Sequence, residues 1–143
     1  EIIPGFAFKS QDFNNNGFPV VKITDICPPT VNTKNCSHVD LSKYNVDKLK
    51  KYLVQRDDIV LAMTGATIGK IGRVLSGRSY INQRVAKFVA NNEISQKYLY
   101  YRLINSTTTF KIILIVQVLN RTLVEQVLED THFVSITHKI NHT

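Results

Sequence analysis

The sequence predicts an α+β fold, in which a twisted and mostly antiparallel sheet carries short helices. The chain has 143 residues, of which 43% are hydrophobic, so it can bury the core of a single domain. Short apolar runs are separated by glycine, asparagine and proline, a pattern typical of brief strands joined by turns. Two other segments have helical spacing behind a capping residue. The resulting order of strand, helix, strands and helix is that of an α+β domain.

The first strand is predicted over Phe18–Ile26, with Val21 and Ile23 on its buried face. A turn at residues 14–17 precedes it, because asparagine and glycine adopt positive φ at little cost. A Pro-Pro pair ends the strand, and we expect a polar loop from there to Ser37.

Helices are predicted after Asn45 and after Ser95, since both residues are good N-caps. The first helix covers Val46–Leu53 and exposes its lysines, whereas the second turns Leu99 and Leu103 inward. Between the helices, glycines separate three expected strands of one antiparallel sheet, at Asp58–Thr64, Lys70–Leu75 and Tyr80–Val89.

Positive charge is concentrated in the first part of the chain. The net charge is +7, and residues 1–111 carry 16 Lys and Arg against 8 Asp and Glu. No acidic residue occurs from Ile59 to Asn92, a stretch with five Lys and Arg residues. Such a stretch predicts a positive belt that attracts polyanions, nucleic acid first, although a solvated surface with excess lysine gives the same count.

Several function classes are disfavoured. Residues 65–70 resemble a phosphate-binding loop, but they are one residue short and link two strands. Cys27 and Cys36 with His38 match no common zinc spacing, so we expect no metal site and no cofactor, and the chain shows no convincing catalytic set. Two cysteines suit a reducing cytoplasm, and no apolar run is long enough to span a bilayer. The first residues lack the basic start typical of a signal peptide, and the sequence has no initiator Met, so we expect it to begin inside a longer product.

Several strings are specific enough to indicate a family. The strings GFAFKS and GFPVVKI near the start, DIVLAMTGATIGK from Asp58, INQRVA from Ile81 and YLYYRL from Tyr98 occur in this order. Together they resemble a target recognition domain from the specificity subunit of type I restriction–modification enzymes, over about residues 1–111. The resemblance implies the methyltransferase-type target recognition fold.

The resemblance also implies a function. In that family the domain reads one half of a bipartite double-stranded DNA target and performs no chemistry, while methylation and cleavage belong to methyltransferase and restriction subunits. Two such domains are joined by conserved coiled-coil helices. Alternatively, the chain is a stand-alone nucleic-acid or protein interaction module with no restriction partner.

The candidate DNA-binding residues are basic or amide side chains in polar loops and turns. Lysines and arginines neutralise phosphates, and Gln83 and Arg84 are the best candidates for base contact, because amide and guanidinium forks match base edges. Alternatively, Gly65 and Gly69 serve only their turn, and Asn82 and Gln83 satisfy backbone groups at the end of the sheet. The full set is Lys9, Ser10, Lys34, Asn35, Thr64, Thr67, Lys70, Arg73, Asn82, Gln83 and Arg84.

Residues 112–143 depart from the family pattern. Reading codons for residues 112–127 one nucleotide earlier permits the family's Gly-Ser-Gln-Pro-Asn-Ile-Ser motif, so we predict a frameshift near Lys111. The chain would then lack the conserved helix and its docking to a methyltransferase subunit. The apolar run 112–118 would favour self-association, with no tendency to enter a membrane.

Overall fold

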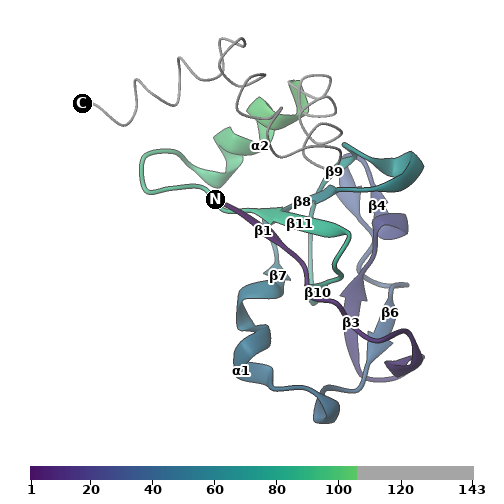
Figure 1. The fold of residues 1–143 in the computed structure, drawn as a ribbon. Helices are drawn as coiled ribbons and strands as arrows, with labels where there is room; N and C mark the ends of the chain where they lie inside the picture. The colour runs from purple at the N-terminus through teal and green to yellow at the C-terminus, as the bar shows by residue number, and fades with distance from the viewer. Residues whose placement is uncertain (106–143) are drawn as a thin grey trace, which may run out of the picture. The chain divides into compact units, whose positions relative to one another are not determined.

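The computed structural model describes residues 1–105, in which two β-sheets pack around a main hydrophobic core to which both contribute. Figure 1 shows the strands of both sheets and the two α-helices at their edges. The six-stranded sheet has the order β1 (Ile2–Pro4), β11 (Val85–Phe88), β8 (Ile59–Ala62), β9 (Ile71–Arg73), β5 (Thr30–Val31) and β4 (Ile26–Cys27). The five-stranded sheet has the order β2 (Phe13–Asn14), β6 (Ser37–Val39), β3 (Phe18–Val21), β10 (Arg78–Ile81) and β7 (Leu53–Gln55).

The helices are short, and both predicted N-caps are confirmed. Asn45 Oδ1 accepts a hydrogen bond from the Lys48 amide at 3.2 Å, and Ser95 Oγ accepts one from the Tyr98 amide at 3.1 Å. Within residues 1–105, none of the helices is long and apolar enough to cross a bilayer. The helices are α1 (Val46–Leu49) and α2 (Gln96–Asn105), with 3₁₀ turns η1 (Ser10–Asp12), η2 (Ile23–Asp25), η3 (Leu41–Lys43), η4 (Lys50–Tyr52) and η5 (Gly65–Thr67).

The α+β class is confirmed, but the strands divide between two sheets where the sequence predicted one. The expected strand Tyr80–Val89 is two strands, and β10 and β11 belong to different sheets. β10 pairs in parallel with β3, with Ile81 opposite Val21, whereas β11 pairs antiparallel with β8. Most strand pairs are antiparallel, and β5 with β9 forms a second parallel pair.

The predicted strand Phe18–Ile26 is also shorter than expected. It ends at Val21, and Val20 and Val21 are both fully buried. The single buried face predicted there is wrong because this strand separates two cores: Val21 packs in the main core, and Val20 in a second, aromatic core with Phe8 and Tyr80. The expected loop before Ser37 contains strand β5.

The boundaries of the helices also differ from the predictions, because strand pairing and core packing decide where the helices end and which residues they bury. The first helix ends at Leu49, because Leu53 is already in β7, paired with Tyr80. On α2 the buried side chains are Leu103 and Tyr100, and the Tyr100 hydroxyl donates to the Pro29 carbonyl at 3.1 Å.

Gly5 permits a close crossing of the N-terminal segment over the end of β10. A Cβ atom at Gly5 would lie 2.3 Å from the Asn82 carbonyl oxygen, so a larger residue cannot fit without moving the backbone. The Phe6 amide then donates to the Ile81 carbonyl at 2.9 Å. This crossing fixes the position of the chain just before β11.

A buried carboxylate anchors η1 to η3 beneath the aromatic core. The Tyr44 hydroxyl donates to Asp12 Oδ2 at 2.5 Å, and Lys43 Nζ donates to Oδ1 at 3.1 Å. The hydrogen bond from Tyr44, followed by that from Lys43, lowers the pKa of Asp12 below its ordinary value. Burial raises the pKa of Tyr44, so its hydroxyl keeps the proton that it donates.

Acid should weaken the fold through Asp12. A carboxylate with a lowered folded-state pKa stabilises the fold above its unfolded pKa of about 3.9, and this contribution is lost as pH falls through the folded value. We therefore expect the stability gap between the wild-type protein and Asp12→Asn, measured by urea unfolding, to shrink from pH 7 to pH 3.

Asp47→Asn is the matched control, since Asp47 forms only an exposed ion pair with Lys50. It should keep the acid sensitivity of the wild-type protein. A gap for Asp12→Asn that is the same at both pH values would contradict this role of Asp12.

Candidate nucleic-acid interface

Two turns that carry predicted contact residues lie side by side at one end of the six-stranded sheet. One turn, residues 64–70, joins β8 to β9, and the other, residues 82–84, joins β10 to β11. Ala62 at the end of β8 pairs with Val85 at the start of β11, and the next amide, of Met63, donates to the Arg84 carbonyl at 2.9 Å. We call the exposed surface of these two turns the two-turn surface.

The first turn is shaped by its glycines. Gly65 and Gly69 have φ of +73° and +80°, a region that glycine adopts without steric cost. The Gly69 amide donates to the Ala62 carbonyl at 2.9 Å and closes the turn. These glycines therefore have the structural role that the sequence left open.

The threonines of this turn are partly engaged within it. Thr67 Oγ1 donates to the Thr64 carbonyl at 3.3 Å. Thr64 Oγ1 is buried without a hydrogen-bond partner among the described residues. The exposed polar groups of this turn are therefore concentrated at its end, at Lys70.

The second turn uses Asn82 for its own backbone. Asn82 Oδ1 accepts from the Gln83 amide at 2.8 Å, and the Asn82 carbonyl accepts from the Val85 amide at 2.8 Å. Gln83 and Arg84 are exposed. The structure thus assigns the oxygen of Asn82 to the turn and presents the next two side chains to solvent.

The charge of the two-turn surface is not neutralised locally. Lys70 and Arg84 are both exposed, and neither forms an ion pair with a carboxylate in residues 1–105. An unpaired ammonium and guanidinium attract anionic groups, and phosphate is the anion that both bind well.

Arg73 lies at the other end of β9 from Lys70, so the cations of the acid-free stretch do not all lie on the two-turn surface. Its Nε is 4.0 Å from Asp57 Oδ1, and its guanidinium lies 5.5 Å from the centroid of the Tyr100 ring. Lys87 Nζ donates to the Leu53 carbonyl at 2.9 Å. Arg78 is the first residue of β10 and lies opposite Gln55 of β7 in the strand register. Because a strand carries the chain from one end of a sheet to the other, cations that precede a strand and cations that end it lie at opposite ends of the sheet.

The remaining candidates lie in two other places. The Lys34 and Asn35 amides donate to Asn32 Oδ1, and the adjacent Thr33 hydroxyl donates to the Ser76 carbonyl in the β9–β10 connection. The Lys9 amide donates to the Tyr44 hydroxyl at 3.3 Å, just before η1 and Ser10. The two-turn surface therefore holds Thr64, Thr67, Lys70, Asn82, Gln83 and Arg84, and it lacks Lys9, Ser10, Lys34, Asn35 and Arg73.

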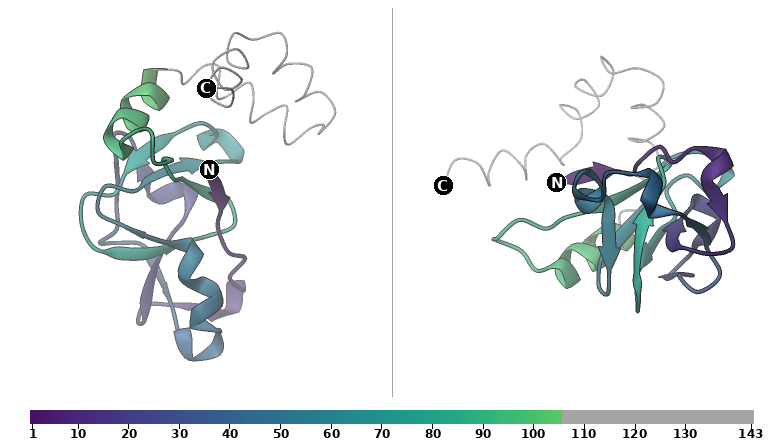
Figure 2. Two further views of the ribbon diagram at one scale, coloured as in Figure 1. Left: turned by 90° about the vertical axis from the view of Figure 1, so that its left-hand side faces the viewer. Right: turned by 90° about the horizontal axis from the view of Figure 1, so that it is seen from below.

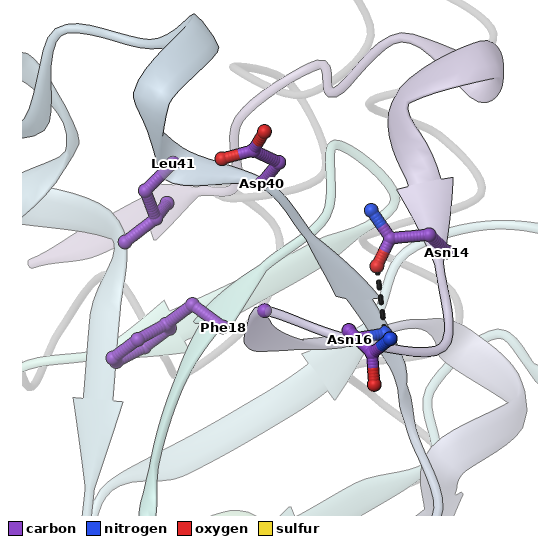
Figure 3. Close-up of a pocket in the computed structure, with 6 residues that line it drawn as sticks. Asn14, Asn16, Phe18, Asp40 and Leu41 are labelled. Carbon is purple, nitrogen blue, oxygen red and sulfur yellow. Dashed lines mark hydrogen bonds between the residues drawn. The ribbon is translucent and has the colours of Figure 1, made fainter.

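An open hollow of about 470 Å³ lies beside the β2–β3 turn (Figure 3). Its lining includes Asn14, whose Oδ1 accepts from the Asn16 amide at 2.8 Å, and Asp40, whose Oδ1 accepts from the Ser42 amide at 2.9 Å. The hydrogen bonds from Ser42 lower the pKa of Asp40, so its carboxylate is charged at neutral pH and repels phosphate. This hollow is therefore unsuited to a DNA backbone.

No group of three His, Cys, Asp or Glu side chains within residues 1–105 could hold a metal ion. Cys27 is exposed, and Cys36 is buried with its thiol donating to the Thr33 carbonyl. The two sulfurs belong to different environments and show no shared site.

Comparison with known proteins identifies the family. Residues 1–129 match the family model described as "Type I restriction modification DNA specificity domain". The chain belongs to this family. The fold is similar to the crystal structure of the HsdS subunit from Thermoanaerobacter tengcongensis, with 15% sequence identity and a TM-score of 0.58 over 78% of this chain. No curated protein sequence matches the chain.

A second similar structure is described as "Structural basis underlying complex assembly and conformational transition of the type I R-M system", with 16% identity and a TM-score of 0.53 over 72% of this chain. The specificity domain described here spans 26% and 24% of the two solved chains, about a quarter of each. The similarity at these identities is one of fold.

The family match runs past Lys111, where we predicted the family-like part to end. Residues 112–143 lie outside the described residues. The predicted domain boundary and the predicted frameshift therefore stay predictions.

Removing the side-chain oxygen of Asn82 should loosen the second turn of this specificity domain. We expect Asn82→Ala to lower the free energy of unfolding by about 1 kcal/mol, because the Gln83 amide loses its partner. Asn82→Asp keeps an acceptor at the same place and should be closer to the wild-type protein. Urea unfolding at pH 7 measures both, and equal stability of all three proteins would rule out this role.

Proposed function

We propose that this domain binds one half of a bipartite DNA target through the two-turn surface. Membership of the DNA specificity family supports DNA as the ligand. The hydrogen bond from the Met63 amide to the Arg84 carbonyl carries the proposal, because it joins two turns that are far apart in sequence into one polar, positively charged surface.

The side chains of this surface have different tasks in the proposal. Lys70 contacts a phosphate as a point charge and sets affinity without reading sequence. Gln83 and Arg84 contact base edges in the major groove, since an amide pairs with adenine and a guanidinium with guanine through two hydrogen bonds. Both are exposed at the tip of a turn, where they can enter a groove.

The domain contributes binding and no chemistry in this proposal. Methyl transfer and cleavage, with their cofactors, belong to partner methyltransferase and restriction subunits. The chain spans only about a quarter of the similar solved chains, so reading the second half-site requires a second domain.

A charge-matched comparison on the full 143-residue chain tests the proposal. Lys70→Gln/Arg84→Gln removes two charges from the two-turn surface, whereas Lys97→Gln/Arg102→Gln removes two exposed charges from α2. Gln96 at the start of α2 is hydrogen-bonded to the Phe88 carbonyl, at the opposite end of β11 from Arg84. The control charges therefore lie far from the two turns.

Fluorescence anisotropy with a 30-base-pair duplex of random sequence, from 50 to 200 mM salt, measures log K against log salt. The first variant should reduce the magnitude of the slope by about 1, for the lost phosphate contact of Lys70, and the control should leave the slope unchanged. A wild-type slope near zero would reject DNA binding. A slope that the α2 variant changes instead would reject the two-turn surface as the contact site.

A further inference from the structure

A second basic surface lies on α1 and η4. Residues 41–52 contain four lysines and one acidic residue, Asp47. Leu49 is only 1% exposed and Tyr52 is half-buried, while Lys48, Lys50 and Lys51 are exposed. The apolar side of this segment therefore packs on the aromatic core and turns the lysines to solvent.

Two of these lysines lack a carboxylate partner among the described residues. Asp47 Oδ1 pairs with Lys50 Nζ at 2.7 Å. Lys48 and Lys51 have no ion pair with a carboxylate in residues 1–105. They are three positions apart, a spacing that puts side chains on one face of a helical segment.

The Tyr52 ring holds one of the two ammonium groups in place. Lys51 Nζ lies 4.8 Å from the centroid of this ring. A cation over an aromatic face is attracted without giving up its hydrogen-bond donors. Lys51 can therefore still donate to an anion from this position.

The segment that bears these lysines is linked by packing to the second turn of the two-turn surface. The Tyr52 ring lies 5.5 Å from the Phe6 ring, and Phe6 forms a β-bridge with Asn82 in the second turn. β1 also packs against η4. α1 lies directly below β7 and β1 in Figure 1, and Figure 2 shows the same elements from two further sides.

We propose that Lys48 and Lys51 contact phosphates of the same DNA duplex whose bases the two-turn surface reads. This inference rests on the proposed function, and it adds a contact region where the sequence predicts only a helix with exposed lysines. Phe6 contacts Tyr52 on one side and Asn82 on the other, so η4 and the second turn are held in one packed unit on which a single duplex can lie.

The composition of this surface favours a nucleic acid over an acidic protein. Lysine is depleted in protein–protein interfaces, where aromatic residues and arginine dominate, but it is a common phosphate ligand. The exposed apolar residue of α1 is Val46, which is 45% exposed, and no exposed aromatic ring accompanies it on this helix. The surface thus offers charge with little apolar contact area.

The test replaces both unpaired lysines in the full chain. We expect Lys48→Gln/Lys51→Gln to reduce the salt slope for the random 30-base-pair duplex by about 2, roughly one for each phosphate contact. Lys48→Arg/Lys51→Arg keeps both charges and should restore the wild-type slope. Thermal unfolding followed by circular dichroism establishes that each variant is folded.

The outcomes separate this inference from the proposed function. If the wild-type slope is near zero, both fail. If Lys70→Gln/Arg84→Gln reduces the magnitude of the slope but Lys48→Gln/Lys51→Gln does not, the inference alone is overturned. Lys48 and Lys51 would then contact an acidic protein or solvent, and not DNA. An equal decrease with the Lys97→Gln/Arg102→Gln control would show a general charge effect and would also overturn it.

Discussion

The pairing of β8 with β11 is the constraint on which the rest of the account depends. Ala62 opposite Val85 sets the register, and the Met63 amide then meets the Arg84 carbonyl at 2.9 Å. A shift of one residue would turn every side chain of the strand to the other face, and because both faces of β8 are buried, each side chain would then lose its packing partners. Two turns separated by more than ten residues of sequence thereby form one surface.

The local elements of this fold could be predicted from sequence, since their causes are local. Asn45 and Ser95 cap helices because their side-chain oxygens reach amides three residues on. Gly65 and Gly69 mark a turn because their φ is positive. The division into two sheets could not be predicted this way, because the parallel pairing of β3 with β10 joins residues sixty positions apart.

The positions of the charged residues at the candidate site also depend on contacts between distant parts of the sequence. The acid-free stretch from Ile59 to Asn92 predicted a positive belt, and the structure puts Arg73 and Lys70 of this stretch at opposite ends of β9. Asp57, which comes just before the stretch, meets Arg73 through the pairing of β8 and β9. Conversely, Lys48 and Lys51 were not predicted as contacts, because only the packing of Phe6 between Tyr52 and Asn82 connects them with the two turns.

Hydrogen–deuterium exchange of the full chain, with and without duplex DNA, tests the central claim most directly. A ligand on the two-turn surface should slow amide exchange in residues 64–70 and 82–84 together, since one contact covers both. Residues 56–58 and the β9–β10 connection at 75–77, at the other end of the sheet, should exchange as in the free protein. Slower exchange at residues 75–77 with no change in the two turns would contradict the account.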